Sequence, residues 1–345
     1  MNHFREPITI RPVDHRDDLR PTIADIVEAS RRIESHIERT AVCRIDAIDA
    51  ELGAEVYFKL ENRQAGGAFK SRGACNTVFS LGDAEARSGV VTHSSGNHGA
   101  ALARAAQRRG IPAFVVMPET AKAEKIANVE RFGAEIIFCR PTQRDREETA
   151  ERIQRATGAT MVHPYDDERI VAGAATAALE LGEAVSHLDL FVAPVGGGGL
   201  LAGTARTVES LWPWARCWGA EPIAAGDAWQ SLRRGRVVAQ RTPYTIADGL
   251  RTSLGRLNFE FIRRWVSEIV LVGECEIGRA TDQLCEWFQA PVEPSSAVVL
   301  AALRARRPAL RGKRIGVILS GGVASSGTTA TNVSASGGAG RPPKE

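Results

Sequence analysis

Four consecutive glycines form a segment that could bind an anion through its backbone: Gly196, Gly197, Gly198 and Gly199. They follow the apolar stretch 190–195 and precede a helix-like segment, 200–212. A turn without side chains lets N–H groups converge on an anion, and the start of a helix adds partial positive charge. The run lacks the Lys-Ser/Thr pair of a nucleoside-triphosphate loop and the spacing of a dinucleotide fingerprint. We therefore predict a phosphate-binding cup, with a flexible hinge as the alternative.

Three further segments carry side chains that suit catalysis. They are Gly-Gly-Ala-Phe-Lys-Ser-Arg-Gly-Ala at 66–74 with Lys70, Thr-His-Ser-Ser-Gly-Asn-His-Gly at 92–99 with Asn97, and Ile-Leu-Ser-Gly-Gly at 318–322 with Ser320. A buried lysine amine has a lowered pKa and is then available as a nucleophile. The backbone amides of a Ser-Gly-Asn-His-Gly turn that opens a helix suit a carboxylate for the same reason that they suit a phosphate. The chain thus combines two candidate anion sites with a candidate nucleophile.

The segments that must position these residues alternate between strands and helices. Short apolar strands are predicted at 56–60, 89–92, 113–117, 135–138, 161–162, 190–195, 216–220 and 314–319. Helices are predicted from residue 22, where Thr22 and Asp25 are capping residues, and at 71–81, 99–109, 122–132, 143–157, 170–181 and 200–211. This alternation is typical of an α/β fold with parallel sheets flanked by helices.

The order of these motifs resembles one known family. A lysine after an aromatic residue, an asparagine loop, a glycine cup and a late serine resemble the fold-type II pyridoxal-phosphate enzymes, and within them the serine/threonine dehydratase and serine racemase family. The resemblance runs from about residue 21 to residue 322. It implies a two-domain fold of the tryptophan synthase beta type, with a smaller domain, 88–165, inserted into a larger one, 1–87 and 166–323. The Ser/Thr/Gly/Pro-rich tail, 324–345, is predicted to be disordered.

The resemblance assigns cofactor contacts to individual residues. Lys70 would form the Schiff base with pyridoxal phosphate, Phe69 would cover one face of the ring, and Asn97 would bind its 3′-oxygen. The glycine cup would bind the phosphate, and Ser320 would face the pyridine nitrogen. A serine hydroxyl does not enforce a protonated pyridinium, so the ring is a weaker electron sink. We therefore expect loss of a β-hydroxyl rather than transamination.

The resemblance also assigns a substrate loop: Ser94, Ser95, Gly96, Asn97 and His98. In racemase-like members, the serine that corresponds to Ser95 transfers a proton on the face opposite the lysine. The alternative is that Ser95 only caps the helix. Arg146 aligns with a family arginine on the distal side of the substrate, where a guanidinium binds a second carboxylate bidentately. The alternative for Arg146 is an ordinary charge on a helix surface.

Two positions depart from the common family pattern. Ala68 stands where a serine is usual, and some hydroxyaspartate dehydratases share this alanine, which is a weak indication of the substrate. Val323 replaces an asparagine that helps to hold ATP in the mammalian-type racemase, so we do not expect activation by a nucleotide.

A third group of residues matches a divalent-metal loop of the family. Glu221 and Asp227 would be carboxylate ligands and Ala225 a carbonyl ligand. Such oxygen donors suit Mg²⁺, or Mn²⁺ or Ca²⁺, in a site that stabilises the fold. The alternative is a pair of solvated acids on a surface loop.

Composition narrows the class of protein. Of 345 residues 43% are hydrophobic and 25% charged, and the formal net charge is +3 without a basic stripe, so nucleic-acid binding is not indicated. The six cysteines form no CxxC pair, which favours buried free thiols in a reduced compartment. No signal-peptide core or membrane-length apolar run is present. We expect a cytoplasmic protein, and the family implies a homodimer.

The resemblance predicts a dehydratase that acts on L-serine, L-threonine or 3-hydroxyaspartate. Lys70 would remove the α-proton, the β-hydroxyl would leave, and hydrolysis would give a 2-oxo acid and ammonia. One alternative is a racemase that uses Lys70 and Ser95 on opposite faces. A β-replacement synthase is a weaker alternative, because its relatives usually have a different substrate loop. A non-catalytic ligand-binding relative is the remote one.

Overall fold

The computed structural model describes residues 19–94, 96–240 and 243–322, which contain two β-sheets. The larger sheet has the strand order β1 (Val42–Cys43), β2 (Glu55–Leu60), β10 (Arg314–Leu319), β7 (Leu190–Pro194), β8 (Arg216–Pro222) and β9 (Glu268–Val272). The smaller sheet has the order β5 (Glu135–Cys139), β4 (Ala113–Pro118), β3 (Val90–His93) and β6 (Thr160–Met161). All neighbouring strands are parallel except the edge strand β1, which pairs antiparallel with β2. The predicted α/β class with parallel sheets is confirmed, with this one antiparallel edge.

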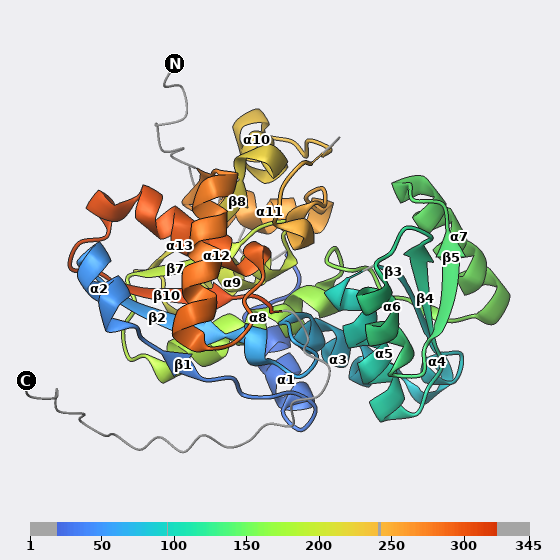
Figure 1. The fold of residues 1–345 in the computed structure, drawn as a ribbon. Helices are drawn as coiled ribbons and strands as arrows, with labels where there is room; N and C mark the ends of the chain where they lie inside the picture. The colour runs from blue at the N-terminus through green and yellow to red at the C-terminus, as the bar shows by residue number, and fades with distance from the viewer. Residues whose placement is uncertain (1–18, 95, 241–242, 323–345) are drawn as a thin grey trace, which may run out of the picture.

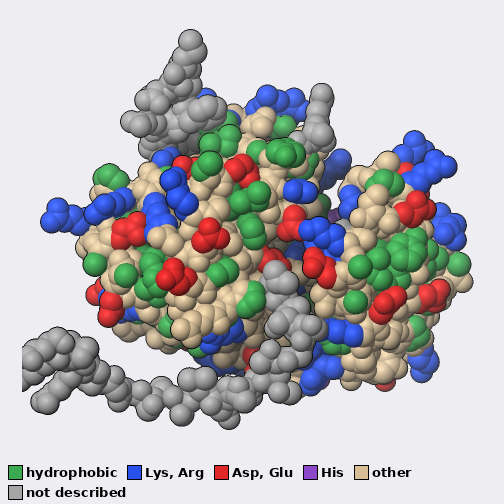
Figure 2. All heavy atoms as spheres, in the orientation of Figure 1, with side chains coloured by type: hydrophobic (Ala, Val, Ile, Leu, Met, Phe, Trp, Pro, Cys, Tyr) green, Lys and Arg blue, Asp and Glu red, His purple; other side chains and the backbone are tan. Residues whose placement is uncertain are grey.

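Helices flank both sheets, which lie in separate parts of the molecule (Figure 1). In chain order they are α1 (Ile23–Ile33), α2 (Asp46–Leu52), α3 (Lys70–Ser80), α4 (Asp83–Arg87), α5 (Asn97–Arg109), α6 (Ala123–Glu130), α7 (Gln143–Thr157), α8 (Glu168–Ala184), α9 (Gly199–Leu211), α10 (Asp227–Arg234), α11 (Arg256–Trp265), α12 (Glu274–Phe288) and α13 (Pro294–Ala305). Short 3₁₀ turns are η1 (Glu61–Arg63), η2 (Ile223–Ala225), η3 (Asp248–Leu250) and η4 (Arg307–Ala309). Between the two parts, α3 packs on α8 and on α5. The space-filling view shows a groove between the parts with acidic and basic side chains along its edge (Figure 2).

The larger sheet is buried on both faces. On β2, Val56 and Phe58 pack with side chains of α12 and α13, whereas Tyr57 packs with those of α8, α9 and α11. Successive side chains of a strand point to opposite faces, so one strand serves both cores. A sheet covered on both faces exposes only its edges and strand ends, which is where ligands bind in open α/β folds.

Close packing of α3, α8 and α9 depends on small residues. A β-carbon at Gly173 of α8 would lie 2.5 Å from the carbonyl oxygen of Arg72, and one at Gly203 of α9 would lie 2.8 Å from the β-carbon of Ala175. Each distance is far below a normal contact, so a larger residue would force the helices apart. The glycines therefore set the distance of α3 from the larger sheet.

A buried network of four charges holds α3 in place. The Arg72 guanidinium, fully buried, donates to both oxygens of Glu61 at 2.7 and 2.8 Å and to both oxygens of Glu180 at 2.7 and 2.8 Å. Lys59 donates to Glu180 at 2.6 Å. The two cations balance the two anions, and the partners belong to β2, η1 and α8. Such bidentate pairs add geometric specificity, so the network fixes how α3 is rotated.

Most of the predicted elements are present, with ends shifted by one to three residues. The capping box that begins α1 is confirmed, since Asp25 N–H donates to the Thr22 hydroxyl at 3.3 Å and Thr22 N–H to Asp25 at 2.8 Å. The sequence analysis assigns no element between residues 221 and 313, where the structure has α10 to α13 and β9. The strands of the smaller sheet lie between residues 90 and 161. The domain limits stay a prediction, and the predicted tail lies outside the described residues.

All six cysteines are free, as predicted, and Cys75, Cys139 and Cys217 are buried. Cys275 is exposed on α12, so the expectation of buried thiols is wrong there; its position on the outer face of an amphipathic helix is the reason. In the part of the chain that the structure describes, no helix is both long and apolar enough to span a bilayer.

Candidate active site

Lys70 is the first residue of α3, and the segment before it is tied to the end of β10. Ala68 forms an antiparallel bridge with Gly321, and the amide of Phe69 donates to the carbonyl of Ser320 at 2.9 Å. The buried charge network fixes the helix that follows. The backbone of Lys70 is therefore held from both sides, beside the predicted serine.

The amine of Lys70 lies among aromatic rings and backbone. It donates to the carbonyl of Pro164 at 2.8 Å and lies 5.1 Å from the ring centroid of Phe69 and 6.0 Å from that of Tyr165. Desolvation lowers the pKa of Lys70 to about 8. A larger fraction of the amine is then neutral near pH 7, as a nucleophile or a proton acceptor requires.

The glycine run, 196–199, forms the buried turn between β7 and α9. Gly198 has φ +92°, which favours glycine, and the first hydrogen bond of α9 runs from Ala202 N–H to Gly198 O at 2.8 Å. The amides before Ala202 therefore have no acceptor within the helix. A β-carbon at Gly197 would lie 2.3 Å from the ring of Tyr165. The glycine run and Lys70 thus meet around the same tyrosine.

Several predicted substrate-loop residues lie at the start of α5, where β3 ends. Gly96 is the N-cap of α5, its amide donates to the Ser94 hydroxyl at 3.3 Å, and Asn97 is the first helical residue. Ser95 lies outside the described residues, so its proton-transfer role stays a prediction. The loop therefore presents the start of a helix, which favours a negative ligand.

His98 follows within the same helix and is only 2% exposed. Burial, together with the nearby charge of Lys70, lowers the pKa of His98 well below its usual value. The ring is therefore neutral at physiological pH and fills space behind the loop. A role in shaping the loop agrees with this position better than proton transfer does.

The side chain of Asn97 points to the start of α13. Its Nδ2 donates to the two oxygens of Glu293 at 3.0 and 3.2 Å. Burial raises the pKa of Glu293 to about 7, and the nearby carboxylate of Asp248 adds to that rise. The segment 293–296 matches part of the active-site wall of the resembled family, without a separate chemical role for Glu293.

Ser320 follows β10 and is almost fully buried, with 6% exposure. Its hydroxyl lies 3.0 Å from that of Ser296 on α13, and Ser296 accepts a hydrogen bond from the amide of Gly321 and donates to its carbonyl, each at 2.6 Å. Ser296 thereby fixes the turn that carries Ser320. Nothing in the local sequence marked Ser296 as a partner, because the contact joins residues far apart in the chain.

Arg146 lies in the first turn of α7 and is half-buried. Its guanidinium donates to Gln143 Oε1 at 2.7 Å and to the carbonyl of Thr142 at 3.4 Å. Burial lowers the pKa of His93 to about 4, and the positive charge of Arg146 adds to the lowering. Arg146 therefore lies near the substrate loop, but a ligand carboxylate would have to replace its bonds to its own helix.

The predicted metal ligands lie at the end of β8, in η2 and at the start of α10. Glu221 accepts two backbone N–H groups of α10 at 2.8 and 2.9 Å, and Asp227 accepts the amide of Leu254 at 2.8 Å. Burial raises the pKa of Glu221 well above its usual value and that of Asp227 to about 7. Ala225 lies between them in η2. Among the described residues, no group of three or more His, Cys, Asp or Glu side chains forms a metal cluster.

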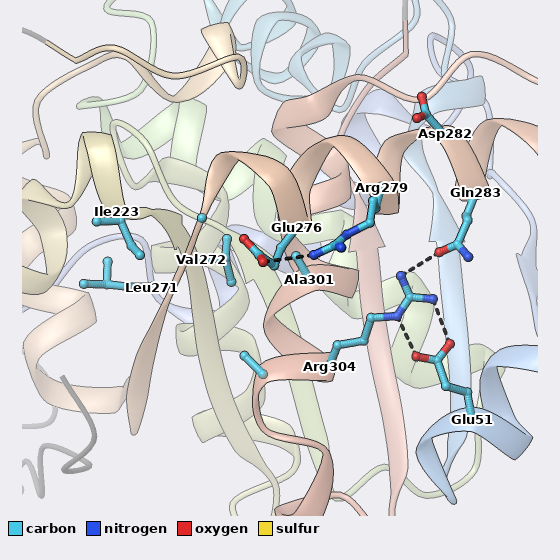
Figure 3. Close-up of a pocket in the computed structure, with 12 residues that line it drawn as sticks. Glu51, Ile223, Leu271, Val272, Glu276, Arg279, Asp282, Gln283, Ala301 and Arg304 are labelled. Carbon is cyan, nitrogen blue, oxygen red and sulfur yellow. Dashed lines mark hydrogen bonds and ion pairs between the residues drawn. The ribbon is translucent and has the colours of Figure 1, made fainter. Parts of the chain in front are cut away.

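A surface pocket lies elsewhere, between α12, α13 and the end of β9 (Figure 3). Arg304 donates to both oxygens of Glu51 at 2.7 Å and to Gln283 at 2.6 Å, and Arg279 pairs with Glu276 at 3.0 Å. These side chains satisfy one another across the pocket. None of the predicted catalytic or cofactor residues lines it, so we do not assign it to the active site.

The residues around Lys70 fit pyridoxal phosphate. A lysine with a lowered pKa suits an aldehyde, and the unpaired amides at the start of α9 suit a phosphate. The buried serine at the end of β10 is a neutral hydrogen-bonding group that suits a ring nitrogen. The structure brings these groups together from β7, β10 and α3.

Comparison with known proteins gives the family. Residues 33–321 match the family described as pyridoxal-phosphate dependent enzyme. The chain is 46% identical to a beta-hydroxyaspartate dehydratase of Paracoccus denitrificans over 88% of this chain and 96% of that one. It is 44% identical to a serine racemase of Arabidopsis thaliana over 89% of this chain and 95% of that one. The crystal structure of serine racemase from Dictyostelium discoideum superposes with a TM-score of 0.84 at 42% identity, covering 87% of this chain and 98% of that one. The chain belongs to the pyridoxal-phosphate dependent enzymes, and the predicted fold-type II relationship is confirmed.

Proposed function

We propose that this enzyme is an ammonia-lyase that converts a β-hydroxy amino acid to a 2-oxo acid and ammonia. The observation that carries the proposal is Lys70, fixed between β10 and the glycine run with a lowered pKa. The similarity to a beta-hydroxyaspartate dehydratase supports 3-hydroxyaspartate as the preferred substrate. L-Serine and L-threonine are the smaller members of the same substrate class.

Pyridoxal phosphate supplies an aldehyde for the substrate amino group and a ring that withdraws electrons from the α-carbon. The glycine run would bind the phosphate through its backbone amides, Phe69 would cover the ring, Asn97 would donate to an oxygen on it, and Ser320 would donate to its nitrogen. Lys70 would accept the α-proton at Nζ, because burial lowers the pKa of its amine and increases the neutral fraction. Loss of the β-hydroxyl as water and hydrolysis of the C–N bond then release the products.

The substrate carboxylate is bound by the start of α5, through Ser94, Gly96 and the amides that follow. A second carboxylate on the β-carbon is bound by Arg146, which exchanges its bonds to the first turn of α7 for a bidentate pair. His98 supports the loop from behind.

Racemisation is the second candidate function, favoured by the similarity to serine racemases. It requires a proton donor on the face opposite Lys70, and the sequence offers Ser95 for that role. A serine hydroxyl at that position delivers a proton after Lys70 has removed one, so both reactions share one site.

We also propose that Glu221, Asp227 and the carbonyl of Ala225 bind Mg²⁺, Mn²⁺ or Ca²⁺. Two buried carboxylates with raised pKa values favour a cation as the compensating charge. The metal would stabilise the fold rather than act in catalysis, because none of its ligands belongs to the predicted catalytic motifs. The proposed protein is a cytoplasmic homodimer, in which each chain has a larger domain, 1–87 and 166–323, and an inserted smaller domain, 88–165.

The test is an assay for ammonia and 2-oxo acid with L-serine, L-threonine and each stereoisomer of 3-hydroxyaspartate. Chiral analysis of the remaining amino acid measures racemisation in the same samples. We expect most turnover with a 3-hydroxyaspartate isomer. If the remaining amino acid changes configuration and no 2-oxo acid is released, the enzyme is a racemase and the lyase proposal is wrong.

A further inference from the structure

We infer that Glu293 is a positioning residue that holds the side-chain nitrogen of Asn97 and leaves the second N–H of that nitrogen for the cofactor. This deepens the proposed function, because it rests on Asn97 as a cofactor contact. The resemblance places Glu293 in a wall segment of the active site but gives it no separate chemistry. The inference stands on the contacts that join α5, α13 and the end of β10.

The backbone of Glu293 is fixed on both sides. Its N–H donates to Gly321 O at 3.0 Å, and its carbonyl accepts the amides of Ser296 at 2.8 Å and Ala297 at 3.0 Å as the N-cap of α13. A β-carbon at Gly321 would lie 3.1 Å from Glu293 Oε2 and 3.4 Å from Asn97 Nδ2. A glycine at position 321 therefore leaves the room in which the carboxylate and the amide meet.

The carboxylate selects one orientation of the amide. Ionised Glu293 only accepts hydrogen bonds, whereas an asparagine amide has a donor end and an acceptor end. Nδ2 of Asn97 lies 3.0 and 3.2 Å from the carboxylate oxygens. The flipped amide would place two acceptors against each other. Nδ2 carries a second N–H, which stays available for an oxygen of the bound cofactor.

Protonation of Glu293 would remove this selection. A protonated carboxyl group has its own O–H and can donate to the amide oxygen, so both orientations become acceptable. Burial and the carboxylate of Asp248 on η3 together raise the pKa of Glu293 to about 7, against the opposing effects of Asn97 and of Lys125 on α6. Lys125 and Asp248 form their own pair at 2.6 Å. The orientation is therefore fixed above about pH 7 and relaxed below it.

The test measures the dissociation constant of pyridoxal phosphate for the apoprotein between pH 5.5 and 9, in the wild type and in Glu293→Gln. Both proteins share the titrations of Lys70 and of the cofactor. The effects of these titrations on the two dissociation constants therefore cancel in their ratio. We expect a ratio near one at pH 5.5 that rises to about tenfold at pH 8.5, the size of one hydrogen bond to a charged acceptor. Glu293→Asp should retain part of this pH dependence.

A double-mutant cycle identifies the partner. In an Asn97→Ala background, Glu293→Gln should leave the dissociation constant unchanged at every pH. A ratio that does not vary with pH, or an equal effect in the Asn97→Ala background, would overturn the inference. If Glu293→Gln does not fold, the dissociation constants of the wild type and of Asn97→Ala are compared across the same pH range. Only the wild type should then show a change in the constant near pH 7. No substrate is added, so failure of the lyase assay leaves this result intact.

Discussion

At the scale of single residues, the site depends on where side chains are absent as much as on where they are present. The glycine run was predicted as an anion cup from its sequence alone. The structure adds that Gly197 lies directly against Tyr165, which in turn lies beside the amine of Lys70. The same glycine is therefore required for packing, whatever ligand the amides bind.

Gly197→Ala tests this packing. The new β-carbon would overlap the Tyr165 ring, so the ring must move, and overpacking of this kind costs about 1–3 kcal/mol. We expect that loss in the free energy of unfolding of the apoprotein, together with weaker cofactor binding. Gly278→Ala on α12 is the matched control, since its nearest neighbour is 3.9 Å away and alanine favours a helix. Equal stability of the two variants would contradict the packing argument.

At the scale of elements, the lysine is positioned by a helix whose rotation is fixed by buried charges. Arg72 lies two residues after Lys70, and its partners Glu61 and Glu180 come from η1 and α8. Such networks are not always net stabilising, but the loss of one member leaves the others uncompensated. The consequence for function is a constant direction of the Lys70 side chain.

Arg72→Met should therefore destabilise the protein strongly. Removal of one partner from a buried pair costs about 3–5 kcal/mol, because Glu61 and Glu180 remain buried with only Lys59 as a counter-charge. Urea unfolding of the apoprotein measures the change. Arg144→Met removes an ion pair whose arginine is 84% exposed, with Glu148 as its partner, and should give no resolvable change. A similarly small decrease in the free energy of unfolding in both variants would show that the network does not hold α3.

Local sequence patterns predict the helices and strands around the site, but they do not predict the long-range contacts. The capping box of Thr22 and Asp25 spans only four consecutive residues, and the strands that precede the predicted loops are short apolar runs. The Ser296–Ser320 and Asn97–Glu293 pairs join residues 24 and 196 positions apart. A single sequence carries no local signal for such contacts, because folding alone brings them together.

At the scale of the whole molecule, two polar contacts join elements on opposite sides of the groove. Asn97 on α5 meets Glu293 on α13, and Lys125 on α6 meets Asp248 on η3. Asn97 is both a proposed cofactor contact and a member of one of these pairs, so the position of the smaller sheet relative to the larger one affects that contact. The family resemblance predicts an inserted domain, but not which residues meet across its boundary.

The proposed metal site also acts on the whole molecule. A cation that binds only the folded state at 100 times its dissociation constant stabilises it by about 2.7 kcal/mol. We expect Mg²⁺, Mn²⁺ or Ca²⁺ to raise the thermal midpoint of the holoenzyme, and Asp227→Asn to abolish the rise. Asp282→Asn on α12, away from the loop, is the control and should retain it. A midpoint that none of the three ions changes would refute the metal site.

The central claim is that a lysine at the start of α3 makes this chain an ammonia-lyase for β-hydroxy amino acids. The most direct measurement is the release of ammonia and oxaloacetate from 3-hydroxyaspartate by the purified holoenzyme and by Lys70→Ala, with circular dichroism to check the fold of the variant. The account predicts equal amounts of the two products from the wild type and none from the folded variant. Release that persists in Lys70→Ala, or no 2-oxo acid from 3-hydroxyaspartate, serine or threonine, would contradict it.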